Sequence, residues 1–198
     1  MSEALYEITK NTTALLKDRG SKFYAYSYSV HSLEEIEAYL ASLRKKYYDA
    51  RHHCYAYRLG AKGEHYFSTD DREPSNSAGP PILAAIRSEL LTNVLVIVVR
   101  YFGGTKLGIR GLIEAYRGAS EAALKQAKKQ ELIARTVFKL HYTYEKTADL
   151  KRILHPFEID VIHAEYTDSC TQTLAIKEED FAALQQKLEA AAFEAVVE

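Results

Sequence analysis

The hydrophobic pattern of the first 70 residues predicts three strands and one helix. Residues 22–30, KFYAYSYSV, alternate in polarity and are rich in aromatic side chains, as strands are. Ser32 followed by Glu35 has the spacing of a capping box, which predicts the start of a helix. The apolar residues of this helix recur at helical spacing: Leu33, Ile36, Leu40 and Leu43. Residues 53–60 and 64–70 predict a hairpin closed by the turn AKG.

The following 60 residues predict a loop, a buried strand and two helices. Residues 71–81 are dense in turn formers, and Pro80 and Pro81 suit the first turn of the helix that comes next. Residues 93–102, NVLVIVVRYF, form a continuous apolar run of strand length, which predicts a central place in a sheet. The second helix follows the glycines and has one apolar stripe: Leu112, Tyr116, Ala119, Ala123 and Ala127.

Beyond residue 130 a new series of strands and helices begins. Residues 136–145 predict a strand and 147–155 a short helix, and 158–166 with 170–177 predict a second hairpin. The last helix is amphipathic, with apolar residues at Phe181, Leu184, Leu188 and Ala192. With a closing strand in FEAVVE, this βαββα order matches the ferredoxin-like plan. We therefore expect an α+β fold for both parts of the chain.

The charge distribution supports a division into two domains, 1–130 and 131–198. The overall net charge is -1, but residues 1–130 hold 19 Lys and Arg against 14 Asp and Glu, a net of +5. Residues 131–198 hold 7 against 13, a net of -6. A basic domain attracts polyanions. The alternative, a chance imbalance between two solvated surfaces, stays open at this point.

Composition indicates a soluble cytoplasmic protein. No apolar run approaches the roughly 18 residues that a membrane span needs. The N-terminal stretch MSEALYEITKN does not have the basic and apolar regions of a secretory signal. Cys54 and Cys170 lie far apart in the sequence, so no disulfide framework is expected.

The segment 100–112, RYFGGTKLGIRGL, combines glycines with cations directly after the predicted central strand. Its glycines would let backbone N–H groups approach an anion at the start of the next helix. The nearby cations are Arg100, Lys106, Arg110 and Arg117. Neither the P-loop spacing nor the dinucleotide fingerprint occurs. An anion-binding segment and a plain strand-to-helix connection both remain open.

Three other groups of residues are candidates for chemistry. Asp70, Asp71 and Glu73 could bind a metal or serve as acid and base, although carboxylates before a helix more often cap it. His52 and Cys54 share one face of a strand, but no second Cys/His pair completes a zinc site. Fifteen tyrosines, several of them next to arginines, are typical of single-stranded nucleic-acid binding and equally of ordinary strands.

Three blocks of sequence resemble the signature of the YigZ/YvyE/IMPACT family: CYAYRLG, DDREPSNSAGPPIL and NVLVIVVRYFGGTKLGIRGLIEAY. The resemblance covers residues about 20–129, and the later part is similar to the smaller C-terminal domain of bacterial members. It implies that the first domain has the fold of the second domain of ribosomal protein S-five, shared with domain four of elongation factor G. It also implies a ferredoxin-like second domain.

The sequence departs from that signature at several positions. Arg72 stands where DDGEPS has glycine, and Asn76 and Ser77 replace Gly-Thr. Arg110 replaces a glycine of LG-x-GGL. Fewer glycines narrow the backbone freedom for an anion cradle, while Arg72 and Arg110 add positive charge.

The resemblance implies a translation-related binding protein with RNA or the ribosome as its partner. The residues expected to carry that binding are Arg100, Tyr101, Gly103, Gly104, Lys106, Gly108, Arg110, Tyr116 and Arg117. Eukaryotic members inhibit activation of a stress-responsive translation kinase by competing for its activator, so a protein-interaction module is one alternative. Another is an enzyme acting on a phosphorylated small molecule, with the acidic loop as Mg²⁺ ligand or base. We expect no cofactor, no resident metal and no catalytic residue.

Overall fold

The computed structural model describes residues 4–197, which form two compact units. The first ends at Leu132 and the second begins at Ile133, two residues beyond the boundary expected from charge. Both units mix helices with sheets, so the chain is α+β. Within residues 4–197, no helix is both long and apolar enough to cross a membrane.

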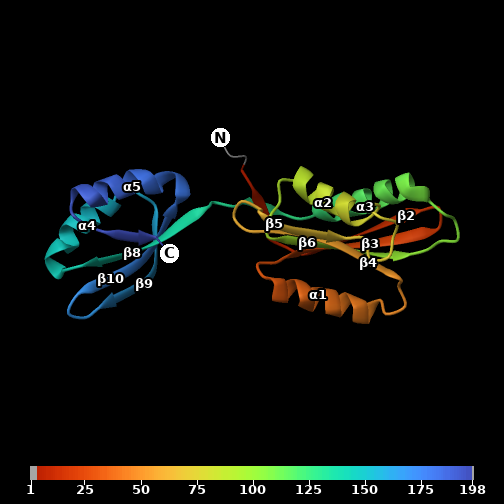
Figure 1. The fold of residues 1–198 in the computed structure, drawn as a ribbon, viewed down its shortest axis with the longest axis horizontal. Coiled ribbons are helices and arrows are strands. Elements are labelled where there is room, and N and C mark those ends of the chain that lie inside the picture. Colours follow the sequence, from red (N-terminus) through yellow and green to blue (C-terminus); the bar gives the residue numbers. More distant parts are fainter. Residues whose placement is uncertain (1–3, 198) are drawn as a thin grey trace. The chain divides into compact units, whose positions relative to one another are not determined.

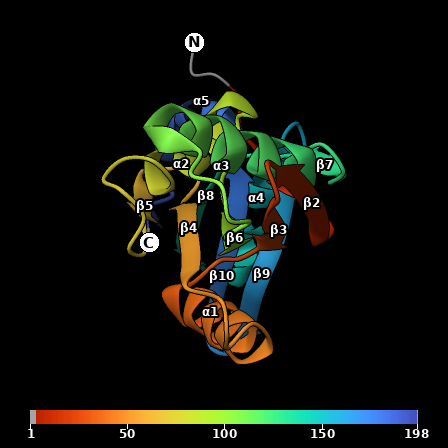
Figure 2. The same cartoon turned by 90° about the vertical axis from the view of Figure 1, so that its right-hand side faces the viewer.

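The first unit is a five-stranded sheet with helices on both faces. Its elements are β1 (Tyr6–Ile8), β2 (Thr12–Asp18), β3 (Ser21–Ser29), α1 (Leu33–Lys46), β4 (His52–Leu59), β5 (His65–Thr69), α2 (Gly79–Ser88), β6 (Val94–Tyr101), α3 (Gly108–Leu124) and β7 (Lys129–Glu131). The strand order is β2-β3-β6-β4-β5 with every neighbouring pair antiparallel, and β1 pairs separately with β7. In Figures 1 and 2, α1 lies on one face of the large sheet, and α2 and α3 lie on the other.

The central strand β6 explains the longest apolar run in the sequence. Side chains alternate between the faces of a sheet, and here both faces are covered by helices. Val94, Val96 and Val98 join the core under α2 and α3. Leu95, Ile97 and Val99 join the core under α1. The predicted central position is therefore confirmed.

The start of α1 agrees with the predicted capping box in one half. The Ser32 hydroxyl accepts the Glu35 N–H at 3.3 Å, as a cap does. The Glu35 carboxylate accepts from the His31 N–H at 2.7 Å, one residue before the cap, instead of closing the box on Ser32. Pro80 and Pro81 occupy the first turn of α2, as predicted.

Strand β2 was not predicted, although it forms a tight hairpin with β3. The two turn residues are Arg19 and Gly20, with φ of +43° and +81°. Positive φ at both central residues is what a two-residue hairpin of the favoured twist requires. Leu15 and Leu16 are adjacent, and this interrupts the polar/apolar alternation that reveals a strand.

The second unit is a four-stranded sheet with two helices sharing its core. Its elements are β8 (Arg135–Tyr142), the 3-10 turn η1 (Tyr144–Lys146), α4 (Thr147–Leu154), β9 (Ile159–Tyr166), β10 (Cys170–Lys177), α5 (Glu178–Ala190) and β11 (Ala195–Val197). The strand order is β11-β8-β10-β9, all antiparallel. Leu150 of α4 and Leu184 and Leu188 of α5 are buried against Phe138 and Leu174 of the sheet. The predicted order of elements is found, including the closing strand.

Candidate nucleic-acid interface

Asp70 caps helix α2 from the preceding loop. One of its carboxylate oxygens accepts the N–H groups of Ala78 and Gly79 at 2.9 and 2.8 Å, and the other accepts from Asn76 at 2.8 Å. Ala78, at the N-cap position, has no side chain to do this. A carboxylate at a helix N-terminus also interacts favourably with the helix dipole. Asp70 is thus fully occupied as a cap.

Strand β4 holds the acidic loop through three successive residues. The His53 N–H donates to the Asp71 carboxylate at 2.6 Å, and His52 Nδ1 lies 2.9 Å from the Asp71 carbonyl oxygen. The Cys54 thiol donates to the Asp70 carbonyl at 3.0 Å. The second carboxylate of the loop therefore also serves the fold.

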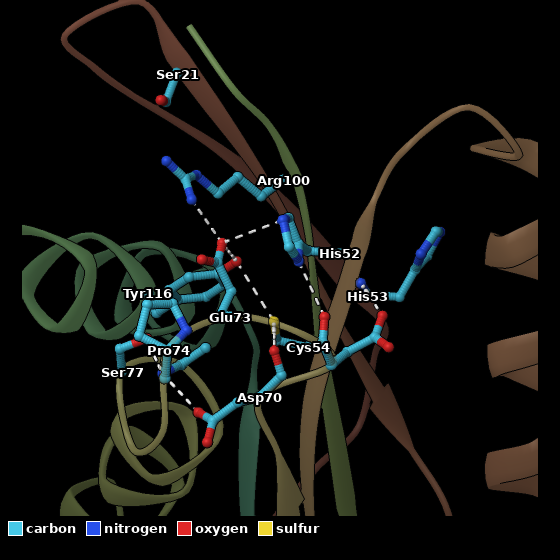
Figure 3. Close-up of polar contacts among 12 residues, drawn as sticks. Ser21, His52, His53, Cys54, Asp70, Glu73, Pro74, Ser77, Arg100 and Tyr116 are labelled. Carbon is cyan, nitrogen blue, oxygen red and sulfur yellow. Dashed lines mark hydrogen bonds and ion pairs between the residues drawn. The ribbon is translucent and has the colours of Figure 1, made fainter. Parts of the chain in front are cut away.

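Glu73 is buried at the centre of a polar cluster that joins the loop to β6 and α3 (Figure 3). Its side chain is only 4% exposed. One carboxylate oxygen accepts from Arg100 Nη1 at 2.6 Å and from the Tyr116 hydroxyl at 2.8 Å, while His52 Nε2 lies 3.9 Å away. A buried charge is tolerated only when it is paired and hydrogen-bonded, and Glu73 meets both conditions.

The environment of this cluster keeps its neutral groups neutral. Burial, reinforced by the nearby Cys54 and Glu73, raises the pKa of Tyr116. Burial also raises the pKa of the Cys54 thiol, which removes the thiolate that a nucleophile or metal ligand would need. Burial lowers the pKa of His53. Among residues 4–197, no three His, Cys, Asp or Glu side chains are grouped so that they could hold a metal ion.

Three residues of the loop have a left-handed backbone. Asp71, Arg72 and Asn76 have φ of +36°, +70° and +62°. Two of these, Arg72 and Asn76, replace glycines of the resembled signature. The glycine preference at these two positions thus has a direct backbone reason, because only glycine adopts such φ values without a steric penalty.

Arg100 and Tyr101 are neighbours in β6 and point to opposite faces of the sheet. Arg100 is 7% exposed and bound to Glu73, and Tyr116 has no exposed surface at all. The roles of phosphate contact and base stacking that the sequence suggested for Arg100 and Tyr116 do not fit this placement. Tyr101 lies on the α1 side and is half-buried, with its hydroxyl 2.5 Å from Asp49.

Three of the four glycines of the segment divide into one structural position and two open ones. Gly103 packs against the β2–β3 turn, and a Cβ there would lie 1.8 Å from the carbonyl carbon of Gly20. Its N–H also donates to the Ser21 hydroxyl at 3.2 Å. Gly104 and Gly108 have φ of +90° and +73°, with open space where a Cβ would be. Backbone at these two positions is therefore accessible from solvent.

The remaining cations of the segment are exposed. Lys106 lies in the loop between β6 and α3. Arg110, 93% exposed, pairs with Glu114 at 3.0 Å, and Arg117 pairs with Glu121 at 2.8 Å, each one turn along α3. Exposed pairs of this kind contribute about 0–1 kcal/mol, so they do not prevent either arginine from meeting another anion.

Sheet register brings further cations beside Lys106 that the sequence analysis did not find. Lys22 opposes Tyr101 and His52 opposes Arg100, so the starts of β3 and β4 meet the end of β6 at one end of the sheet. We call this the loop end. Its exposed cations, from four separate segments, are Arg19, Lys22, Arg51, Arg72 and Lys106. No local signal could have grouped them, because the grouping depends on strand order.

Comparisons with known proteins agree with the resemblance. A family model described as the Impact N-terminal domain matches residues 19–124. An IMPACT family member of Haemophilus influenzae is 29% identical over 189 residues, 93% of this chain and 91% of that protein. YigZ of Escherichia coli is 31% identical over 156 residues, covering 78% and 76%. A crystal structure of a protein described as hypothetical has a TM-score of 0.72 at 26% identity, covering 99% of this chain and 98% of its own.

Proposed function

Since this chain belongs to the IMPACT family, we propose that it is a translation-related regulator that binds RNA, free or within the ribosome, through the loop end of its first unit. The family supplies the link to translation that the resemblance implies. The gathering of exposed cations from four segments supports the choice of RNA. The proposed site of action is the cytoplasm, where these partners are.

The orientation of the charged side chains at the loop end carries this proposal. The loop carboxylates Asp70, Asp71 and Glu73 all accept hydrogen bonds from the protein itself. Asp18 lies 3.4 Å from Arg19, and Asp49 accepts from Tyr101. These carboxylates keep their charge, but each one is directed toward a donor of the protein itself. Arg19 is partnered by Asp18, and Lys22, Arg51, Arg72 and Lys106 are exposed to solvent. A surface that presents cations in this way attracts phosphates from any nucleic-acid sequence.

The loop 102–107 is the proposed centre of the contact. Lys106 supplies a cation, and Gly104 and Gly108 leave backbone on either side of it uncovered. Arg110 and Arg117 extend the contact along α3 as exposed cations. Arg100 and Tyr116 act only indirectly, because their bonds to Glu73 fix β6, α3 and the acidic loop relative to one another.

The proposal extends to the fold of each unit. We assign the second unit to the ferredoxin-like fold because its strands, numbered in chain order, lie in the spatial order fourth, first, third, second. The first unit, with α1 on one face of its sheet and α2 and α3 on the other, is proposed to share the fold of the second domain of ribosomal protein S-five.

Salt dependence of binding tests the function. Association with purified ribosomes and with a 12-base-pair RNA duplex should weaken with salt, with a log–log slope of about -3.6 to -4.5 on the duplex for four or five phosphate contacts. Lys106→Glu should weaken binding to either partner and make the slope shallower by about 1. Lys10→Glu is the matched control, because Lys10 is exposed and precedes β2, whose other end carries Arg19. Salt-independent binding, or no binding at 50 mM salt, would overturn the proposal.

Exposed apolar side chains on either side of Lys106 in the sequence, one directly after β6 and one in α3, favour a second candidate, a protein partner in translation control. Phe102 is 58% exposed and Ile109 60% exposed, close to Lys106 in the sequence. Where such side chains join into one apolar patch, they mark a protein interface. Capture of the same partner from lysate before and after nuclease treatment, with loss in a Phe102→Ser variant, would favour this candidate over RNA.

A further inference from the structure

We propose that one corner of the five-stranded sheet is a stacking platform for single-stranded RNA, an inference that rests on the proposed function and names its ligand. The platform consists of five residues on β2, β3 and β6: Leu15, Lys17, Lys22, Tyr24 and Tyr101. It lies on the α1 face of the sheet, beside the loop end.

Sheet register places these side chains next to one another. Lys17 opposes Lys22, which in turn opposes Tyr101, and Leu15 opposes Tyr24. Residues directly opposite in an antiparallel pair share one face of the sheet. The platform is therefore two adjacent rows across neighbouring strands, with aromatic rings and cations side by side.

Helix α1 covers this corner only in part, through its C-cap residue Tyr47, which stacks on Tyr24. The core beneath α1 includes Tyr26 and Ile97, which lie further along the same strands, and Val99, which opposes Tyr24. At the corner, Leu15 is 48% exposed, Lys17 and Lys22 are exposed, and Tyr24 and Tyr101 are half-buried. These side chains consequently present apolar and aromatic surface to solvent on a rigid sheet.

Aromatic contacts with Tyr47, at the end of α1, hold the two rings in place. Tyr24 stacks on Tyr47, with ring centroids 5.5 Å apart and planes 28° apart. Tyr101 packs edge-on against both rings, at 6.1 and 6.3 Å, and its hydroxyl is fixed by Asp49. Rings that are already ordered lose little conformational entropy on binding, which favours a stacking partner.

Charge decides which kind of partner the platform suits. Lys17 and Lys22 are joined on this side by Lys46, whose ammonium lies over the Tyr47 ring. Asp49, which accepts from Tyr101, keeps its negative charge, so three ammonium groups stand against one carboxylate here. Asp18 belongs to the opposite face, because it opposes Ser21. Cations beside aromatic rings hold the phosphates and bases of a single strand. A duplex cannot occupy the rings in this way, since its bases are stacked on each other.

A tryptophan probe tests the platform directly. The chain contains no tryptophan, so a single substitution gives an unambiguous fluorescence signal. In Tyr24→Trp, saturation with a dodecauridine oligonucleotide should quench the emission with the same midpoint as anisotropy of the labelled oligonucleotide. The matched control is Tyr66→Trp, because Tyr66 is 55% exposed and lies against Arg87 on the other face. Binding without quenching at position 24 would overturn the proposal.

Affinity measurements give a second, independent readout. Tyr24→Leu should weaken dodecauridine binding about 5-fold to 150-fold through the loss of stacking, and Tyr24→Phe should retain it. The Lys17→Glu/Lys22→Glu variant should make the salt slope shallower by at least about 1.4, and both lysines are exposed, so folding should be unaffected. Equal quenching by an oligoglutamate of the same length would show that charge alone acts, and would also overturn the platform.

The outcomes separate this inference from the proposed function. If the wild-type protein binds ribosomes or duplex RNA but not dodecauridine, the platform is wrong and the function stands. If it binds none of these, both are wrong. If it binds dodecauridine and the position-24 variants respond as described, both are supported.

Discussion

Two arginines stand where the family signature has glycine, Arg72 and Arg110. Restoring glycine should raise the free energy of unfolding at the first position and lower it at the second. Arg72 has φ of +70°, whereas Arg110 lies in the first turn of α3. A left-handed backbone destabilises a residue with a Cβ by roughly 1–2 kcal/mol, and glycine removes this strain. The greater freedom of glycine in the unfolded chain cancels about 0.5–1 kcal/mol of that gain. Arg72→Gly should therefore stabilise the first unit by about 0.5–1 kcal/mol.

At Arg110 the same change should destabilise. Glycine is about 0.8–1 kcal/mol worse than alanine inside a helix, and arginine is close to alanine. The substitution also removes the pair with Glu114, worth about 0.3–0.5 kcal/mol. A cation near a helix N-terminus is unfavourable, so removing the guanidinium of Arg110 should regain about as much stability as the loss of this ion pair costs. Arg110→Gly should therefore lower the free energy of unfolding by about 1 kcal/mol.

Urea denaturation in the Tyr66→Trp background measures both changes, because that fluorophore reports on the first unit alone. Arg72→Ala is the control, since alanine has the same backbone strain without the guanidinium, and its stability should match the parent. The reasoning would be refuted if Arg72→Gly were the less stable of the two glycine variants. It would also be refuted if Arg72→Ala stabilised as much as Arg72→Gly.

Three further predictions concern the buried polar cluster. Glu73→Ala should lower the free energy of unfolding by about 3–5 kcal/mol, because Arg100 is left buried without its partner; Arg100→Met in the same chain should recover part of it, measured by urea denaturation. Burial lowers the pKa of His53, so the unfolded state binds more protons than the native state below about pH 6.5. The free energy of unfolding should therefore fall as the pH drops from 7.5 to 5.5, and it should fall less in His53→Gln. Because burial raises the pKa of the Cys54 thiol, a thiol reagent at pH 8 should label it only in urea; rapid labelling of the native protein would contradict the structure.

Local pattern was sufficient for most elements of the fold. Two patterns were informative: the apolar run of β6, which is buried on both faces, and the apolar stripe of α3 that contains Tyr116. Buried positions recur with the period of the strand or helix, so the sequence pattern reveals the element. That stripe already placed Tyr116 in the core, and its alternative role as a stacking ring conflicted with it. Arg100 lies on the same face of β6 as Val96 and Val98, so the alternation of side chains along the strand already predicts that its side chain points into the core.

The candidate site was predicted less well because its contacts are non-local. Glu73 and Arg100 are 27 residues apart, and nothing in either segment names the other as partner. The loop-end cations become neighbours only through the order β2-β3-β6-β4-β5. The hairpin turn at Arg19 and Gly20 carries a usable signal, since a glycine between two short runs marks a turn.

The contact of Gly103 with Gly20 joins two surface turns, the loop after β6 and the β2–β3 hairpin tip. Backbone meets backbone there, with no side chain between them that could change rotamer and absorb a displacement. We therefore expect a ligand that shifts the loop bearing Lys106 to shift also the hairpin tip that precedes Lys22. A side chain introduced at Gly103 would force the two turns apart, because its Cβ would lie 1.8 Å from Gly20.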